Sequence, residues 1–345
     1  MNGKHSMRII HQADRQKWSE FVKTHPQGNI FQTPEMYEVY KQTKNYEPLF
    51  LGVTSEDGDV LATLLAVIQR DYRNFLGGLT ARSIIWGGPL IKDNDAAILA
   101  FILQEYENLL GDSAIYTQIR NLGDTGNIHI FEEARFVYEE HLNIIVDLSK
   151  PEDLLWKEVH SKRRNEIRRA QKEGTYTREL VQMSDVEKMY GILREVYHNA
   201  KLPFADKSMF MAAFEMLKPV GLCRYFGAYN NGTLVGTICV LAYKQRLYDW
   251  YAGSLREYLN KHPNDLLPWE VFRWGKEHGY LIFDFGGAGS PHKDYGVRDY
   301  KKKFGGEFVS YGRFQRVHKP MKYSLAKMGY SAWRFLKGRI TIGVK

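Results

Sequence analysis

The chain has 345 residues, of which 44% are hydrophobic, enough for packed cores in about two domains. It begins MNGKHSMRII, without the apolar run of a secretory signal, and no stretch approaches the roughly 18 apolar residues of a membrane span. Cys223 and Cys239 are too few for a disulfide framework, so we expect a protein of the reducing cytoplasm.

The first half of the chain has the pattern of one α/β unit. Apolar residues at helical spacing predict two helices near the start, and apolar runs on either side of Glu56-Asp57-Gly58 predict a hairpin. The expected elements are helices around 18–22 and 36–40, strands at 49–53, 60–68 and 84–86, a helix at 96–106, and strands at 114–119 and 136–146.

The second half repeats this order. Its expected elements are a helix at 189–197, strands at 225–229, 234–241 and 247–251, a helix around 269–274, and strands at 281–283 and 308–314. The turn glycines Gly58 and Gly232 are 174 residues apart, and Phe136 and Phe308, which begin the closing strands, are 172 apart. Two landmarks at nearly one offset predict a duplicated α/β unit. We place the domains at 1–150 and 151–318.

A basic helix is expected between the two halves. Residues 157–172 carry a net charge of +5, and the apolar stripe of the helix includes Val159 and Ile167. Arg163 lies four residues from each of these, inside the stripe, where a guanidinium is costly unless it is paired. A phosphate would be a natural partner, because Arg binds it through a planar fork. The alternative is a solvated basic face.

A glycine-rich stretch from Tyr280 to Glu307 follows the last expected helix. It contains a strand that ends in Asp284, a glycine turn and the three lysines 301–303. A strand that ends in an acid and a glycine turn brings polar groups to the carboxyl edge of a sheet, where α/β proteins commonly bind ligands. This stretch is therefore a candidate ligand site.

The net charge of +8 originates in the C-terminal tail. From Arg313 to Lys345 there are nine Lys and Arg and no Asp or Glu, which leaves 39 cations against 40 anions in the preceding residues. Basic residues interleaved with aromatic ones, here Phe314, Tyr323, Tyr330, Trp333 and Phe335, fit an anionic interface such as a phospholipid surface or a nucleic acid. We treat 319–345 as a basic aromatic tail that could contact an anionic membrane. The alternative is a C-terminal helix whose aromatic residues pack on the body of the protein.

Several motifs together resemble the Fem family (FemXAB), the peptidoglycan interpeptide-bridge aminoacyltransferases. The run HSKRRNEIRRA at 160–170 is similar to the basic helix of that family, and FDFGG at 283–287, GVRDYK at 296–301 and FGG at 304–306 are similar to its C-terminal signature. Weaker matches are GNIFQTP at 28–34 and PNDLLPWE at 263–270. The matches span almost the whole chain, and their order is that of the family.

This resemblance implies an α/β fold of two tandem GNAT-like acyltransferase domains, with mixed sheets flanked by helices and no coiled-coil arm. It also implies that an amine on a lipid-linked muropeptide, a diphosphate-bearing peptidoglycan precursor, attacks the ester carbon of an aminoacyl-tRNA. The expected partners are therefore aminoacyl-tRNA and the lipid-linked muropeptide. No cofactor is expected.

The resemblance and the chemistry nominate ten site residues. Lys301 matches the lysine of the family signature and could stabilise the tetrahedral oxyanion, and Asp284 could orient a lysine, take a proton, or cap the glycine turn. Tyr251 and Ser254 match positions that line the cleft of the second domain, although Tyr251 could equally belong to an aromatic core. Phosphate contacts are expected for Arg163, Arg164 and Arg168. Further substrate-binding candidates are Gln32, Arg298 and Tyr300, where the last replaces the phenylalanine usual in the family.

Two other functions remain open from the sequence. An acetyl-CoA-dependent N-acyltransferase of the same fold, acting on a polysaccharide or peptide precursor, would normally show a diphosphate-binding loop, and no convincing copy is present. A non-catalytic module could bind RNA or an anionic membrane through the basic helix and the tail. The eleven histidines form no metal-binding pattern, so no metal is expected.

Overall fold

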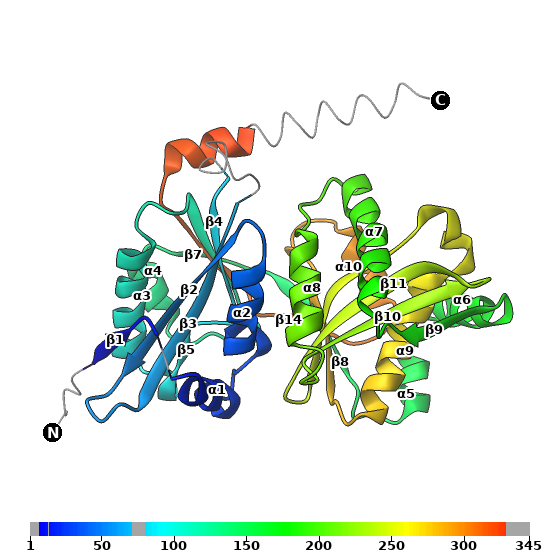
Figure 1. Cartoon of the computed structure of the whole chain (residues 1–345), viewed down its shortest axis with the longest axis horizontal. Helices are drawn as coiled ribbons and strands as arrows, with labels where there is room; N and C mark the ends of the chain where they lie inside the picture. Colours follow the sequence, from blue (N-terminus) through cyan, green and yellow to red (C-terminus); the bar gives the residue numbers. More distant parts are fainter. Residues whose placement is uncertain (1–6, 13, 71–79, 329–345) are drawn as a thin grey trace. The chain divides into compact units, whose positions relative to one another are not determined.

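The structure is a computed structural model that describes residues 7–12, 14–70 and 80–328. The described residues form two compact units, each an α/β layer structure around one mixed sheet (Figure 1). The first unit contains the described residues up to Glu139 and those from Gly312 onward, and the second runs from Glu140 to Tyr311.

The first unit is built on a sheet with the strand order β1-β2-β3-β4-β6-β15-β7, and β5 pairs with β3 outside this path. Trp18 of α1 packs on Phe50, while α3 packs on the other face of the sheet against the neighbouring Leu51. Its elements are β1 (Arg8–Ile10), α1 (Arg15–Thr24), η1 (Ile30–Gln32), α2 (Pro34–Gln42), β2 (Tyr46–Thr54), β3 (Val60–Gln69), β4 (Arg82–Trp86), β5 (Leu90–Ile91), η3 (Lys92–Asn94), α3 (Ala96–Leu110), β6 (Tyr116–Arg120), α4 (Ile128–Glu133), β7 (Val137–Glu139) and β15 (Arg313–Val317).

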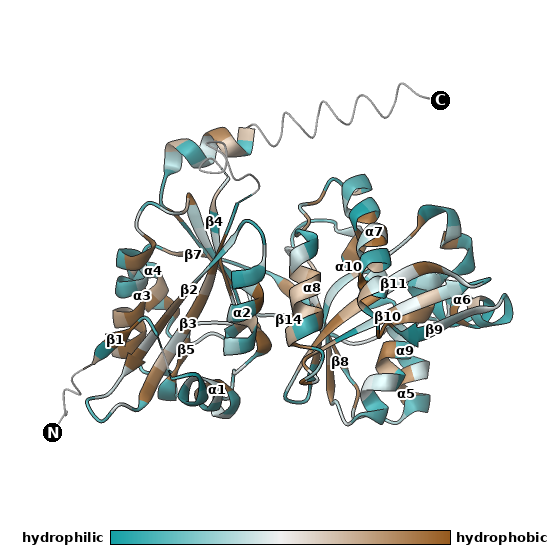
Figure 2. Cartoon of the chain, in the orientation of Figure 1, coloured by the Kyte–Doolittle hydropathy of each residue, from teal (hydrophilic) through white to brown (hydrophobic). Residues whose placement is uncertain are grey.

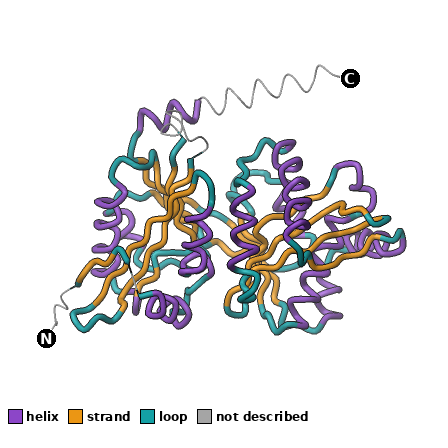
Figure 3. The backbone as a smooth tube through the Cα atoms, in the orientation of Figure 1, coloured by secondary structure: helices purple, strands orange, loops and turns teal. Residues whose placement is uncertain are grey.

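The second unit has a seven-stranded sheet in the order β14-β8-β13-β12-β11-β10-β9. Helix α9 packs on one face of this sheet and α7 on the other, and Figure 3 shows helices on both sides of its strands. Its elements are β8 (Leu142–Asp147), α5 (Glu152–Glu158), α6 (Ser161–Lys172), β9 (Thr175–Glu179), α7 (Met183–Asn199), α8 (Lys207–Met216), β10 (Cys223–Asn230), β11 (Thr233–Tyr243), β12 (Arg246–Ser254), η4 (Arg256–Lys261), α9 (Pro263–Glu277), β13 (Ile282–Gly287), α10 (Gly296–Lys302) and β14 (Glu307–Ser310).

The predicted repeat is present in the structure. In each unit a hairpin is followed by a third antiparallel strand, a helix, and a strand that pairs in parallel with the third: β2-β3-β4-α3-β6 in the first unit and β10-β11-β12-α9-β13 in the second. In the second hairpin, Asn231 and Gly232 have φ values of 48° and 75°, the left-handed conformation that two-residue hairpin turns require. The sequence pattern thus identified the repeated unit correctly.

The closing strands are arranged differently from the prediction. The segment expected as one strand at 136–146 forms β7, which pairs with β15 in the first sheet, and β8, which pairs with β13 and β14 in the second. The segment expected at 308–314 divides in the same way between β14 and β15. The two units therefore exchange one strand each, and the chain passes between them at Glu139–Glu140 and Tyr311–Gly312 rather than at residue 150. The expected boundaries 1–150 and 151–318 do not include this exchange of strands. Hydrogen bonds between strands that are distant in the sequence determine which sheet each closing strand joins.

Apolar residues concentrate in the strands of both sheets, as the hydropathy colouring in Figure 2 shows. Each unit has its own buried core, around Leu64 and Tyr106 in the first and around Phe272 and Phe283 in the second. Among the described residues, no helix has both the length and the apolar character needed to cross a membrane.

The expected basic tail at 319–345 lies partly outside the described residues, which end at 328. In the described part, Tyr323 packs edge-on against Tyr116 of β6, with 5.4 Å between ring centroids. The side chains of Met321, Leu325 and Met328 are exposed. Tyr323 thus packs on the body of the protein, while the three apolar side chains beside it face solvent.

Candidate functional site

The candidate site lies in the second unit, where two parallel strands separate. Strands β12 and β13 are paired from Arg246 opposite Ile282 as far as Tyr248 opposite Asp284, and the pairing ends there although both strands continue. The backbone groups beyond that point no longer satisfy one another across the two strands. A side chain that enters between them therefore finds unpaired carbonyl oxygens.

Lys301 enters at this point from helix α10. Its Nζ atom donates hydrogen bonds to the carbonyl oxygen of Phe285 and, at 3.2 Å, to that of Gly287, both on β13. An ammonium has three N–H donors, so one remains for another acceptor. Burial lowers the pKa of Lys301, and the negative charges of Asp249 and Asp284 oppose this shift. Its neighbours Lys302 and Lys303 make no comparable contact with β13 among the described residues.

Asp249 is the acid whose charge acts most strongly on Lys301. It follows Tyr248 on β12 directly after the parallel pairing ends, and its side chain is half-buried. Burial raises the pKa of Asp249 to about 6; the charge of Lys301 opposes this and the charge of Asp284 adds to it. We did not nominate this residue from the sequence. The signal available was an acid between two aromatic residues inside an otherwise apolar strand.

Asp284 has a structural position. Its side chain is 0% exposed, and its Oδ1 atom accepts hydrogen bonds from the backbone N–H of Gly286 at 2.7 Å and from Asn143 Nδ2 at 3.2 Å. Burial raises its pKa, while the Gly286 amide and Arg246, 3.6 Å from Oδ2, lower it. The bond from the Gly286 amide is the contact expected if Asp284 caps the glycine turn. A catalytic role for Asp284, such as orienting Lys301, stays a prediction.

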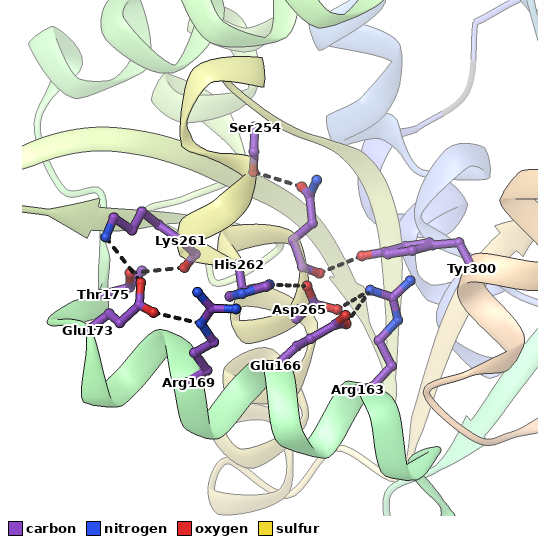
Figure 4. A network of polar contacts seen from close by, with 11 residues as sticks. Arg163, Glu166, Arg169, Glu173, Thr175, Ser254, Lys261, His262, Asp265 and Tyr300 are labelled. Atoms are coloured by element: carbon purple, nitrogen blue, oxygen red, sulfur yellow. Dashed lines mark hydrogen bonds and ion pairs between the residues drawn. The ribbon is translucent and has the colours of Figure 1, made fainter.

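Arg163 is paired within the protein rather than held free for a phosphate. Its Nη1 atom donates to Asp265 Oδ1, in the first turn of α9, and to Glu166 Oε2 at 3.1 Å (Figure 4). Its guanidinium also stacks on the ring of Tyr300, 4.7 Å from the ring centroid. The sequence argument that this cation must be paired is confirmed, because Glu166 and Asp265 both pair with it. The expected phosphate contact of Arg163 stays a prediction.

Tyr300 and Ser254 join the same network through Asn264. The hydroxyl of Tyr300 donates to the carbonyl oxygen of Asn264 at 2.5 Å, and Ser254 Oγ donates to the side-chain oxygen of Asn264 at 2.7 Å. Figure 4 shows these contacts linking α6, α9, α10 and the end of β12. The network fixes α10, and with it Lys301, relative to the sheet.

Three residues in this network could in principle bind a metal ion. The candidate ligand atoms of Glu166, His262 and Asp265 lie within 4.8 Å of one another. The guanidinium of Arg163 is bonded to both carboxylates, so the space between them already contains a cation. We therefore assign this cluster a structural role.

Tyr251 and Arg298 also have local structural contacts. The ring of Tyr251 lies in an aromatic cluster, 5.0 Å from Phe210 and 5.5 Å from Tyr197 between centroids. Arg298 donates to the carbonyl oxygens of Ser290 at 2.7 Å and Lys293 at 2.6 Å, which fastens the loop before α10. Arg298 thus has a structural contact in its loop, and Tyr251 has the aromatic surroundings that its packing alternative predicts. Substrate contacts of both residues stay predictions.

Gln32 lies in the first unit and is 0% exposed. Its amide donates to the carbonyl oxygens of Leu65 at 3.1 Å and Trp86 at 2.8 Å and accepts from the Leu65 N–H at 2.8 Å. All three contacts are to backbone groups of β3 and β4, so the amide of Gln32 connects these two strands, and its nomination as a substrate-binding residue stays a prediction. Sequence motifs cannot separate such a buried bridge from a binding residue.

Arg164 and Arg168 remain available on α6. Arg164 is half-buried and makes no side-chain hydrogen bond within the described part of the chain, and Arg168 is exposed with its guanidinium 5.2 Å from the centre of the Trp156 ring. Of the three arginines nominated for phosphate contacts, these two can still reach an external anion.

Comparisons with known proteins place this geometry in context. An acetyltransferase (GNAT) domain family matches residues 158–302, which lie inside the second unit. The chain is 21% identical over 317 residues to the UDP-N-acetylmuramoylpentapeptide-lysine N(6)-alanyltransferase of Weissella viridescens, covering 84% of this chain and 88% of that protein. It is 36% identical over 76 residues to the lipid II:glycine glycyltransferase of Staphylococcus saprophyticus, covering 21% of this chain and 18% of that protein.

Among solved structures, the crystal structure of FemX matches with a TM-score of 0.71 at 15% identity, covering 92% of this chain and 99% of that one. Together with the GNAT match in the second unit and the same strand and helix order in the first, this confirms the expected fold of two tandem GNAT-like domains with mixed sheets flanked by helices.

Proposed function

We propose that this FemXAB-like chain is an aminoacyltransferase that moves an aminoacyl group from aminoacyl-tRNA to an amine of a lipid-linked peptidoglycan precursor. The observation that carries the proposal is Lys301, whose ammonium is held by two carbonyl oxygens of β13 and has a third N–H donor without a partner among the described residues. Two relatives are named UDP-N-acetylmuramoylpentapeptide-lysine N(6)-alanyltransferase and lipid II:glycine glycyltransferase. Both names support aminoacyl transfer, and the second supports a lipid-linked acceptor.

The chemistry requires a donor for negative charge on the carbonyl oxygen. When the acceptor amine attacks the ester carbon of the aminoacyl group, the carbonyl oxygen becomes an oxyanion. Lys301 meets this need because its ammonium is held by two carbonyl oxygens in a partly buried setting, where an electrostatic interaction is stronger than in water. Lys301 is therefore the residue that binds the oxyanion.

We assign the binding of the donor tRNA to the basic helix α6. Arg164 and Arg168 lie on this helix without carboxylate partners among the described residues, as a phosphate-binding surface requires. Arg163 is outside this surface because its charge is already paired.

We assign to the C-terminal segment a contact with an anionic membrane, in which the lipid-linked acceptor resides. In its described part, the apolar side chains of Met321, Leu325 and Met328 are exposed at helical spacing, and Lys322 and Lys327 lie between them. Exposed apolar residues interleaved with cations suit the interface of an anionic bilayer. Binding to vesicles with and without phosphatidylglycerol tests this contact.

A transfer assay tests the function directly. Purified protein is given radiolabelled aminoacyl-tRNA or radiolabelled acetyl-CoA, with a lipid-linked muropeptide as the acceptor. We expect label in the muropeptide from aminoacyl-tRNA alone. Transfer from acetyl-CoA alone would replace the proposal by a GNAT N-acetyltransferase, and no transfer from either donor would support a non-catalytic binding module.

A further inference from the structure

We infer that Asp249 is the proton acceptor for the attacking amine, and that Asp249 and Lys301 form the catalytic pair of this site. The inference rests on the proposed aminoacyl transfer. It concerns the proton of the attacking amine, which the reaction must remove, because an amine that forms an amide has to lose a proton.

The separation of the two parallel strands puts Asp249 in place. Tyr248 is the last residue of β12 paired with β13, so Asp249 is the first residue beyond the pairing. On the β13 side, the carbonyl oxygens of Phe285 and Gly287 are taken by Lys301. The acid on β12 and the ammonium from α10 thus both lie where the pairing of the two strands ends, and each is the strongest opposite charge acting on the other.

A β-bulge directs the next residues of β12. In the pairing with β11, Val240 lies opposite Asp249 and Cys239 lies opposite Tyr251, which leaves Trp250 as the extra residue. Bulges of this kind change the direction in which a side chain points and often occur next to active sites. Asp249 therefore lies at a break in both of its strand pairings.

Of the titratable groups around this position, Asp249 is the one that can exchange a proton with the substrate. Lys301 and Tyr300 approach from α10, Tyr197 from α7, Asp284 from β13 and Cys239 from β11. Burial raises the pKa of Tyr197, Tyr300 and Cys239 far above neutrality, so these remain protonated. Asp284 is fully buried. Within the described part of the chain, Asp249 is half-buried, makes no side-chain hydrogen bond, and has a pKa of about 6, so it is largely ionised at pH 7.

The proton balance of the reaction can then be completed with residues of this chain. The amine nitrogen forms a bond to the ester carbon, the carbonyl electron pair moves to oxygen beside Lys301, and Asp249 takes one N–H proton. When the oxyanion collapses, the bond between the carbonyl carbon and the ribose oxygen breaks. Protonated Asp249 returns the proton to that oxygen, so the products are an amide and the free ribose hydroxyl, with Asp249 and Lys301 in their starting states.

The test is a pH profile of single-turnover transfer between pH 5 and 8, measured on the full-length wild type, Asp249→Asn and Asp249→Ala. Asp57→Asn, an exposed aspartate in the β2–β3 turn, is the matched control. We expect Asp249→Asn to lower the rate about 100-fold at pH 7.5, within the usual range for general base catalysis. The acceptor amine also titrates, so log rate in the wild type should rise with a slope near two below pH 6 and near one above, whereas Asp249→Asn should show a slope near one throughout.

Chemical rescue covers the case in which the rate falls for structural reasons. Formate should restore part of the activity of Asp249→Ala and none of a misfolded protein. Unchanged slopes in Asp249→Asn, a rate within threefold of the wild type, or the absence of formate rescue would each overturn the inference. Absence of transfer by the wild type would instead refute the proposed function, so the two failures are distinguishable.

Discussion

The Nζ atom of Lys301, on α10, lies 3.2 Å from the carbonyl oxygen of Gly287 at the end of β13. Two residues 14 positions apart in the sequence thereby connect a short helix to the point where two parallel strands separate. The carbonyl oxygens of β13 hold the ammonium in one place, so its remaining N–H can point in a fixed direction. Such preorganisation is what makes an oxyanion donor effective.

Replacing Lys301 should therefore abolish most of the transfer. We expect Lys301→Met to lower kcat about 100- to 1,000-fold, because the loss of one oxyanion donor has this typical effect. The KM for either substrate should change little, since the charge it stabilises exists only in the transition state. Steady-state transfer kinetics measure both values. Lys302→Met, an exposed lysine on the same helix, is the control, and comparable losses in both variants would contradict the assigned role.

Arg163→Gln should destabilise the second unit rather than weaken phosphate binding. The change leaves Asp265 and Glu166 without their cation, and breaking a buried pair costs about 3–5 kcal/mol. Burial already raises the pKa of Asp265 to about 6, above its ordinary value, so the stability that this group contributes is present at low pH and is lost as pH rises through about 6. Without Arg163 this pKa rises further.

Urea unfolding at pH 5 and pH 8 measures this effect. The difference in the free energy of unfolding between wild type and Arg163→Gln should be larger at pH 8. Arg169→Gln, which removes an exposed arginine from the same helix, should have a much smaller effect. A stable Arg163→Gln protein with reduced affinity for tRNA would restore the phosphate-binding assignment.

Arg164 and Arg168 are expected to act on the tRNA phosphates. Replacing each by Gln should lower affinity for tRNA regardless of the amino acid attached. The slope of log affinity against log salt should also become shallower, by about one for each phosphate that the protein no longer neutralises. Filter binding between low and physiological salt gives the slope. If the double variant keeps the wild-type slope, the tRNA lies elsewhere.

His318 should make the first unit sensitive to acid. Its Nε2 atom is hydrogen-bonded to Thr117 Oγ1 at 2.8 Å, and burial, with the charges of Arg316 and Lys319, lowers its pKa to about 4. Because the folded protein holds the neutral imidazole, the unfolded state binds more protons between pH 6.5 and 4. Stability should therefore fall by up to about 3 kcal/mol as pH falls through this range.

His318→Gln keeps a partner for Thr117 and removes this titration. Its free energy of unfolding should depend less on pH between about 6.5 and 4.5 than that of the wild type, as measured by urea unfolding. His129→Gln changes an exposed histidine of α4 and should leave the pH dependence as it is. Parallel curves for His318→Gln and the wild type would show that His318 is not the acid-sensitive group.

The sequence predicted those features that depend on local patterns. The hairpin turn at Asn231-Gly232, the apolar strands around it and the repeated order of elements follow from residue type and spacing within a few positions. The need to pair Arg163 also followed from its place in an apolar stripe. The identity of its partner did not, because Asp265 is 102 residues away along the chain.

By itself, therefore, the sequence determined the duplicated α/β unit, its hairpins and the short stretch in which Lys301 is found, because each of these is encoded by neighbouring residues. Only the tertiary structure decided which closing strand completes which sheet, that Asp284 and Gln32 are buried, and that the charges of Asp249 and Lys301 act on each other. Strand exchange, burial and charge pairing depend on residues far apart in the sequence, such as Gln32 and Leu65 or Asn143 and Asp284, and their distances are fixed only when the sheets and helices pack together.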